Sequence, residues 1–534
     1  MTHQKRILCI NAQAKTQNPA LPNAAAVGIE GNRIAFVGSN EEAKLWHKPS
    51  DHVIDCHQHT LLPGIIDSHF HLELGSQSLD KINLSRIQTL EDLKQTILSY
   101  LDNHPQKSHL EGHSLLYSLP TSVSLSRKHL DDIVADRPLI IFAYDGHTAW
   151  ANTCALTAAG LLHGKELPAG NEIVMGEDGT ATGELREPQA FNPVLDLIPP
   201  LSASQQKSLI QQGIRLAHQF GITSVHNMSG NLHLLSLFAE MEKHGELTLR
   251  LCLPLSITPQ TTTADLQAYL EAGNTISSQK IHHRAAKFFM DGVIESYTGC
   301  LIDGYPQRPD VVSETQYSLE EFIELARFCH QKGMQISTHA VGDGAVRRTL
   351  DGYAAIQAEF PQPTLHHRIE HIEVIHPQDL PRFTELGVIA SMQPLHCPPS
   401  AQGVDVWTER VGKERWKYSF AWKTIRSAAE RLIFGSDWPV VSLNPFLGFE
   451  AALLRKPWQD GDPEQKQSIK EIISAYTIDA AYAENQTLKK GMIKEGMLAD
   501  IVLLSQDIFA LPAEDIGKVV PVLTICDGEV VYTA

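Results

Sequence analysis

Short apolar runs alternate with helix-length amphipathic stretches through most of the chain, and this alternation constrains the fold most strongly. Such a pattern is typical of a parallel α/β fold, in which each helix returns the chain to the next strand. Nine runs follow from Leu62, at residues 62–71, 138–145, 222–228, 250–256, 285–291, 335–339, 368–372, 387–392 and 431–437. A (β/α)₈ TIM barrel takes eight strands. The sequence therefore predicts this α/β barrel with one run left over.

The spacing between runs identifies the extra one. Run 138–145 lies in the long gap between residues 71 and 222, whereas the later runs follow one another within about one βα unit. We therefore predict a barrel over 62–489 with an insertion at about 74–200. Short β-segments joined by glycine turns occur near both ends of the chain. Residues 1–61 and 490–534 are expected to form one composite β-sandwich domain.

Composition limits the class of protein and of partner. The 534 residues with 43% apolar content can bury a large core. A net charge of −18 argues against nucleic acid or an anionic membrane as partner, which leaves a small-molecule substrate. The N-terminal apolar stretch is too short for a signal peptide, no stretch reaches membrane-spanning length, and the eight cysteines lack a C-x-x-C pair. We expect a cytoplasmic protein with reduced thiols, and the sequence leaves a homodimer open.

Lys287 is an unusual residue for its place in the chain. It stands inside the apolar run 285–291, where a buried ammonium is costly unless it is paired or neutralised. Lysines in such positions often have a lowered pKa and take part in chemistry. His69 and His71 end the first run, and the two-residue period of a strand points both rings to one face. Two imidazoles on one side of a strand end can hold one cation.

Three further candidates end later runs: His339, His371 and Asp437. Each has an ordinary structural explanation, such as a histidine bonded to a loop carbonyl or an aspartate that caps a helix. In a barrel, however, the carboxyl ends of parallel strands meet at one face, and active sites are built there. Together with Lys287 and the first two histidines, these residues predict a two-metal hydrolase site.

The motifs around these residues carry a family resemblance, at 63–71, 287–292, 339–345, 368–371, 389–396 and 434–440. They resemble the amidohydrolase superfamily, and more narrowly its YtcJ-like branch, whose relatives include N-substituted formamide deformylases. The resemblance implies that CO₂ carboxylates Lys287 and that the resulting carbamate bridges two divalent metals. Mixed imidazole and carboxylate ligation suits Zn²⁺, which is the expected ion, while the residue types leave Fe, Mn and Co open. The resemblance further implies that one metal is held by His69, His71 and Asp437, and the other by His339 and His371.

The resemblance also implies a mechanism. A hydroxide that bridges the metals attacks a carbonyl, and Asp437 is the catalytic general base that moves the proton to the leaving amine. The predicted function is hydrolysis of a non-peptide amide C–N bond of the N-acyl or N-formyl type. Three alternatives stay open: a mononuclear deaminase, which would not usually need Lys287; an ester or lactone hydrolase; and a non-catalytic oligomeric interaction protein. The last is expected to lose ligands, yet all six ligand positions are filled here.

Residues beside the metal ligands complete the prediction. His147, in the insertion, and His396, after the seventh barrel strand, are expected to contact substrate. Arg368 and Glu370 alternate with His371 along their strand, so we expect them to face the helix layer and to be structural. Segment 183–187 is expected near the pocket, without a defined orientation.

Overall fold

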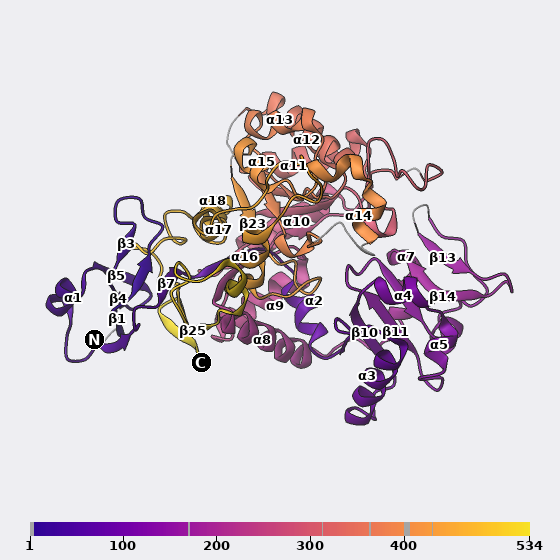
Figure 1. Ribbon diagram of the computed structural model, residues 1–534, viewed down its shortest axis with the longest axis horizontal. Coiled ribbons are helices and arrows are strands. Elements are labelled where there is room, and N and C mark those ends of the chain that lie inside the picture. Colours follow the sequence, from indigo (N-terminus) through magenta and orange to yellow (C-terminus); the bar gives the residue numbers. More distant parts are fainter. Residues whose placement is uncertain (1–4, 169–170, 312, 362–364, 400–405, 430) are drawn as a thin grey trace.

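The computed structural model describes residues 5–168, 171–311, 313–361, 365–399, 406–429 and 431–534. The first four residues of the predicted terminal domain thus lie outside the described part. The molecule is elongated, with both chain ends at one side, the helix-covered barrel strands in the middle and the insertion at the other side (Figure 1).

Parallel strands surround the centre in the order that the sequence predicts. One sheet has the order β18-β16-β15-β8 and the other the order β17-β19-β20-β21-β22-β23. The third and fourth strand positions each consist of two short strands, β16 with β17 and β18 with β19. All eight runs assigned to the barrel contain a strand. The bounds are β8 (Ile65–Phe70), β15 (Ile222–Asn227), β16 (Arg250–Cys252), β17 (Leu255–Ser256), β18 (Ile281–His282), β19 (Ala285–Phe289), β20 (Gln335–Ala340), β21 (Arg368–His371), β22 (Ile389–Met392) and β23 (Leu432–Phe434).

The first and last strands, β8 and β23, approach each other beyond their ends. Within the described ranges they share no ladder of hydrogen bonds, but one parallel bridge joins Phe70 to Trp438. The amide of Asp437 donates to the carbonyl of His69 at 2.6 Å. A Cβ at Gly435 would lie 2.3 Å from the His69 nitrogen, so only glycine permits this approach. The result is a TIM-barrel-like α/β fold.

Amphipathic helices cover the outside of the strands. In α11 (Leu319–Gln331), for example, Phe322, Leu325, Ala326 and Cys329 are buried at helical spacing, and Ser318 caps the first turn. None of the described helices is both long and apolar enough to cross a bilayer. The other helices of this part are α2 (Leu72–Ser78), α8 (Ala203–Gln219), α9 (Leu232–Lys243), α10 (Thr263–Asn274), α12 (Asp343–Glu359), α13 (Leu380–Glu385), α14 (Val406–Val411), α15 (Trp422–Ala428), α16 (Pro445–Leu454), α17 (Ile469–Ala475) and α18 (Ile478–Ala483).

The predicted insertion contains a separate sheet with the order β13-β14-β12-β11-β10-β9. Run 138–145, the one excluded from the barrel, forms β11 in this sheet. The bounds are β9 (Ile82–Asn83), β10 (Leu110–Leu115), β11 (Leu139–Ala143), β12 (Thr148–Ala151), β13 (Glu172–Met175), β14 (Ala181–Arg186), α3 (Leu90–Asn103), α4 (Ser118–Val123), α5 (Arg127–Asp131), α6 (Thr153–Ala158) and α7 (Pro188–Leu195).

Strands from the two ends of the chain share one sheet, β26-β25-β24-β7-β2-β3, and a second sheet has the order β5-β4-β1-β6. An apolar cluster joins Ile7 and Ile29 to Ile501 and Ile525. Strand β7 crosses the predicted boundary at residue 61, and the division into domains stays a prediction. The bounds are β1 (Arg6–Ile10), β2 (Gln13–Lys15), β3 (Asn23–Ala24), β4 (Ala26–Glu30), β5 (Arg33–Gly38), α1 (Asn40–Trp46), β6 (His52–Asp55), β7 (Thr60–Pro63), β24 (Ile501–Leu504), β25 (Pro521–Cys526) and β26 (Glu529–Thr533).

Candidate metal centre

The predicted ligand residues lie at or just beyond the carboxyl ends of the barrel strands. A cavity of about 120 Å³, here called the central cavity, is lined by five of the six: His69, His71, His339, His371 and Asp437. The sixth, Lys287, lies on β19 and is fully buried. The fold thus brings together side chains that are up to 368 positions apart in the sequence, since 437 − 69 = 368.

His69, His71 and Asp437 form the first group that could hold a cation, with donor atoms all within 4.8 Å of one another. Asp437 Oδ1 lies 3.0 Å from His71 Nε2 and 3.5 Å from His69 Nε2. The other ring nitrogens are held in place, because His69 Nδ1 lies 2.7 Å from Glu370 Oε2 and His71 Nδ1 contacts Ser229 Oγ. This arrangement leaves both Nε2 atoms directed at the same point.

His339, His371 and Lys287 adjoin this group. The His371 ring centre lies 4.4 Å from that of His339 and 4.7 Å from that of His69. Burial lowers the pKa of Lys287 to about 8, against the opposing effect of the Glu370 and Asp437 charges. The Lys287 charge in turn helps to lower the pKa of His69, His339 and His371.

Burial keeps these histidines neutral. It lowers the pKa of His69 to about 4 and holds those of His339 and His371 well below the ordinary range. A neutral imidazole is the form that binds metals. Asp437 has the opposite balance: burial alone would raise its pKa, but the adjacent His69, His71 and His396 hold it well below its usual value. The site therefore combines neutral nitrogen donors with a carboxylate.

The His396 side chain lies directly beside the predicted metal ligands. Its Nε2 is 3.6 Å from Asp437 Oδ2, and His371, His396 and Asp437 form a second group that could hold a cation. Its Nδ1 lies 3.4 Å from Glu373 Oε1. The sequence placed His396 after a barrel strand, which is the same signal as for the other histidines, but it did not reveal this proximity to Asp437.

The predicted orientation of Arg368 and Glu370 is wrong. Both are fully buried on β21 and point across the barrel interior, where Arg368 binds the His226 ring on β15 at 2.6 Å and Glu370 binds His69 on β8. The reason is local. His371 has a φ of 72°, so the backbone leaves the extended conformation there and the alternation of faces fails at the strand end. The side chains of Glu370 and His371 can therefore both point toward the metal centre.

Two buried carboxylates near the centre, Asp67 and Asp291, were missed by the sequence analysis. Asp67 Oδ1 accepts the amides of His69 and Ser436, at 3.2 and 2.9 Å, and so ties β8 to the loop that carries Asp437. Asp291 accepts the amides of Val341 and Gly342, each at 2.9 Å, just after the strand that carries His339. Burial raises the pKa of both carboxyls to about 7. Asp67 stands two residues before His69 in the sequence and could have been noticed there. The amides of Ser436, Val341 and Gly342, in contrast, come from distant parts of the chain, which the sequence does not reveal.

His147 lines the central cavity on the insertion side. Its Nδ1 lies 2.9 Å from Glu187 Oε2, so part of segment 183–187 reaches this region. Burial alone would lower the pKa of His147, but the Glu187 charge outweighs it and raises the pKa to about 9. The imidazolium is therefore expected to persist in the folded protein at neutral pH.

Replacing His147 with glutamine tests this interaction. Between the ordinary pKa of about 6.5 and the folded value of about 9, the folded chain retains a proton that the unfolded chain releases. The stability contributed by the pair is thus full below pH 6.5 and lost as pH rises through about 9. We expect the variant's deficit in unfolding free energy to be constant between pH 4.5, the ordinary pKa of Glu187, and pH 6.5, and to disappear as pH rises through about 9. Urea denaturation at several pH values measures it, with His57→Gln as an exposed control; a pH-independent deficit contradicts the assignment.

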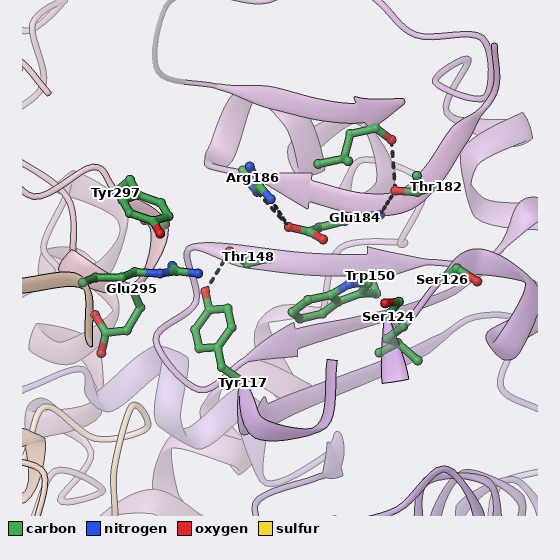
Figure 2. Close-up of a pocket in the computed structure, with 14 residues that line it drawn as sticks. Tyr117, Ser124, Ser126, Thr148, Trp150, Thr182, Glu184, Arg186, Glu295 and Tyr297 are labelled. Atoms are coloured by element: carbon green, nitrogen blue, oxygen red, sulfur yellow. Dashed lines mark hydrogen bonds and ion pairs between the residues drawn. The ribbon is translucent and has the colours of Figure 1, made fainter. Parts of the chain in front are cut away.

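A second chamber, of about 410 Å³, adjoins the central cavity and shares Glu295 with it. In Figure 2, Tyr117 and Trp150 lie on one side of this chamber and Arg186, paired with Glu184, on another. Tyr144 packs edge-on against Tyr117 and donates a hydrogen bond to Glu295. Tyr144 and Glu295 therefore belong to the wall between the two cavities.

The residues fit divalent cations. Lys287 Nζ, Asp437 Oδ1 and His396 Nε2 are buried and have no hydrogen-bond partner among the described residues. Buried polar atoms without partners are costly, and here they are grouped with neutral imidazoles and a carboxylate, which are ligands for Zn²⁺ and related metals. Bound cations would satisfy these atoms.

Comparison with known proteins agrees with this geometry. A sequence model described as "Amidohydrolase family" matches residues 52–532. The chain belongs to the amidohydrolase family. The sequence is 27% identical to the putative amidohydrolase YtcJ of Bacillus subtilis (strain 168), over 95% of this chain and 96% of that protein. It is 23% identical to the N-substituted formamide deformylase of Arthrobacter pascens, over 100% of this chain and 99% of that protein.

A solved structure has the same fold. It is described as an uncharacterized metal-dependent hydrolase from Pyrococcus horikoshii OT3, and it aligns with a TM-score of 0.73 at 23% identity, over 96% of this chain and 99% of that one. The amidohydrolase resemblance inferred from sequence is therefore confirmed. This family member is a hydrolase that acts on carbon–nitrogen bonds, with candidate metal-binding residues at the carboxyl ends of its barrel strands.

Proposed function

We propose that this amidohydrolase cleaves a non-peptide amide C–N bond of the N-acyl or N-formyl type at a centre of two divalent metals, with zinc as the expected ion. One observation carries the proposal. Lys287 is fully buried without a hydrogen-bond partner among the described residues, and its charge acts on three neutral histidines. The name of the Arthrobacter pascens relative, which describes deformylation of N-substituted formamides, supports an amide substrate.

Carboxylation of Lys287 resolves its burial. The neutral amine attacks CO₂, and a nitrogen–carbon bond forms as one C=O π bond opens onto oxygen. The nitrogen then releases one proton to water, which gives an anionic carbamate with two oxygen donors. A pKa lowered to about 8 increases the fraction of amine available for this step. The carbamate oxygens would then be available as ligands for both ions, one of which His69, His71 and Asp437 would hold and the other His339 and His371. When bound, such ions acidify water and polarise the substrate carbonyl.

The chain's own residues then move the proton. The Asp437 carboxylate accepts a proton from the attacking water and delivers it to the nitrogen of the leaving amine. Glu370 orients this end of the site by holding Nδ1 of His69, so that Nε2 faces Asp437. His147 and His396 lie on two sides of the cavity and are proposed to contact the substrate.

Metal analysis of wild-type protein and of Lys287→Met tests the proposal. We expect two metal equivalents per wild-type chain and release of amine from simple formamides and acetamides. Methionine fills much of the same volume but cannot form a carbamate, so the variant should lose one equivalent and its amidase activity. In Lys287→Ala, which leaves a cavity at this position, added propionate should restore part of both. Lys332→Met, at an exposed lysine, is the control.

Other results would favour the alternatives. One metal per chain with full activity in Lys287→Met would favour a mononuclear deaminase. Hydrolysis of esters or lactones without any amide turnover would overturn the amide assignment. A well-folded wild-type chain that binds no metal would favour the interaction protein.

A further inference from the structure

A groove of about 800 Å³ leads away from the central cavity and is here called the side groove. Its volume lies within the usual range for ligand pockets. The two spaces adjoin each other, because four residues line both of them: Tyr144, Glu295, His396 and Val440. The part of a substrate that reaches past these residues from the metal centre would lie in the side groove.

One wall of the side groove is markedly apolar. It comes from the barrel side, where Leu216 and Phe220 of the α8 region and Val441, Leu443 and Leu447 before and within α16 line it. Leu79 and Leu116, from the insertion side, complete the apolar lining, and each is 42% exposed. Single exposed leucines are common on protein surfaces, but two that converge on a groove leading to a buried polar centre indicate a ligand with an apolar part.

The groove opens on the Asp437 side of the centre. Trp438, Pro439 and Val440 follow Asp437 directly in the chain and line the groove. His396, which also lines it, lies 3.6 Å from Asp437 Oδ2. In the proposed function Asp437 delivers a proton to the leaving nitrogen, so the substituent on that nitrogen lies nearest to the groove.

We propose that the side groove binds an extended apolar substituent on the nitrogen of the amide, such as an alkyl chain of about eight carbons, and that it makes this enzyme selective for amides of apolar amines. This assignment rests on the proposed function. The chamber in Figure 2 is less suited to such a group, because among the described residues it shares Glu295 alone with the central cavity. Charged residues line both spaces, Arg186 and Arg410 in the chamber and Lys81 and Arg86 in the side groove, but the side groove also has the apolar wall described above.

A homologous series of N-alkyl formamides, from methyl to octyl, tests the assignment. Burial of each added methylene should lower KM about two- to fourfold until the groove is filled, with kcat nearly constant, because the tail binds equally in ground and transition states. The matched series of N-methyl amides with growing acyl chains should show no such trend. A falling KM in the acyl series alone would overturn the assignment to the nitrogen side.

Variants of Leu79 and Leu116 test whether the N-alkyl chain of the substrate lies in the side groove. In Leu79→Gln/Leu116→Gln, KM for N-octylformamide should rise about fivefold or more while that for N-methylformamide is unchanged. Ser442→Trp, at an exposed residue of the lining, should block long chains and spare short ones. Leu232→Gln is the matched control, because Leu232 is 44% exposed and lies on α9 outside the groove. Equal changes for short and long substrates in the leucine variants would overturn the proposal.

A binding experiment tests the side groove separately from the proposed hydrolysis. Calorimetry with metal-depleted protein and N-octylformamide needs no turnover. Binding that is lost in the double leucine variant supports the groove even if no amide is hydrolysed. If N-methylformamide is hydrolysed but N-octylformamide binds no more tightly than it, the groove assignment fails while the proposed function stands.

Discussion

Replacing Asp437 with asparagine is expected to lower kcat by about 10²- to 10⁴-fold, the range typical of general acid–base catalysis. Asparagine has the same shape and keeps one oxygen donor, but it cannot accept a proton from water or carry it to the amine. The effect should fall mainly on kcat, since Asp437 acts on the reacting proton and the groove residues bind the substrate tail. The low pKa of Asp437, held down by the adjacent histidines against the effect of burial, means that the carboxylate is charged throughout the neutral range.

The measurement pairs steady-state kinetics with metal content, because Asp437 is also a proposed ligand. Loss of activity with both metal equivalents retained assigns the proton-transfer role. Loss of metal and activity together assigns the ligand role alone. Asp460→Asn, at an exposed loop residue, controls for handling of the variants. Full activity in Asp437→Asn would refute both roles.

Replacing Arg368 with methionine is expected to destabilise the protein by about 3–5 kcal/mol, the usual cost of breaking a buried ion pair. Arg368 is fully buried and pairs with Glu370 Oε1 at 2.5 Å. It also donates to the Ser68 carbonyl on β8 and to Ser391 Oγ on β22 and contacts His226 on β15, so it links its own strand to three others. Without it, the one hydrogen-bond partner left to the buried Glu370 carboxylate among the described residues is the neutral His69 ring.

Urea denaturation measures the loss, and a second variant identifies its cause. Arg368→Met/Glu370→Gln removes the uncompensated charge and should be more stable than Arg368→Met alone. Arg382→Met, which removes a partly exposed arginine with its own carboxylate partners, should cost much less. A double variant that is less stable than the single one would show that Arg368 acts through packing and not through charge.

The predicted strand positions came from patterns that depend only on the local chain. Each of the eight barrel runs contains a strand, because apolar residues at strand spacing are buried whichever helix covers them. The place of run 138–145 outside the barrel followed from chain length, since a crossover needs only about one helix. The division of the third strand into β16 and β17, and of the fourth into β18 and β19, could not be recognised in the apolar pattern of the sequence.

The site shows where local rules fail. Alternation along β21 predicted that Glu370 and His371 face opposite ways, and the positive φ of His371 reverses that result. A few residues in such sparsely populated backbone conformations are held by surrounding contacts that lie far away in the sequence. For the same reason the sequence could list His396 beside a strand end but could not reveal that its ring lies next to Asp437.

By itself, the sequence determined the family, the order of the barrel strands and the residue types available to bind metal, because motifs, apolar periodicity and chain spacing are properties of the linear chain. The tertiary structure was needed to show which metal-donor atoms lie together. It also showed that Arg368 and Glu370 point into the barrel interior and that a groove lies beside Asp437. These features depend on contacts between residues hundreds of positions apart. Their geometry is set by how the strands and the insertion pack together, and no local pattern encodes it.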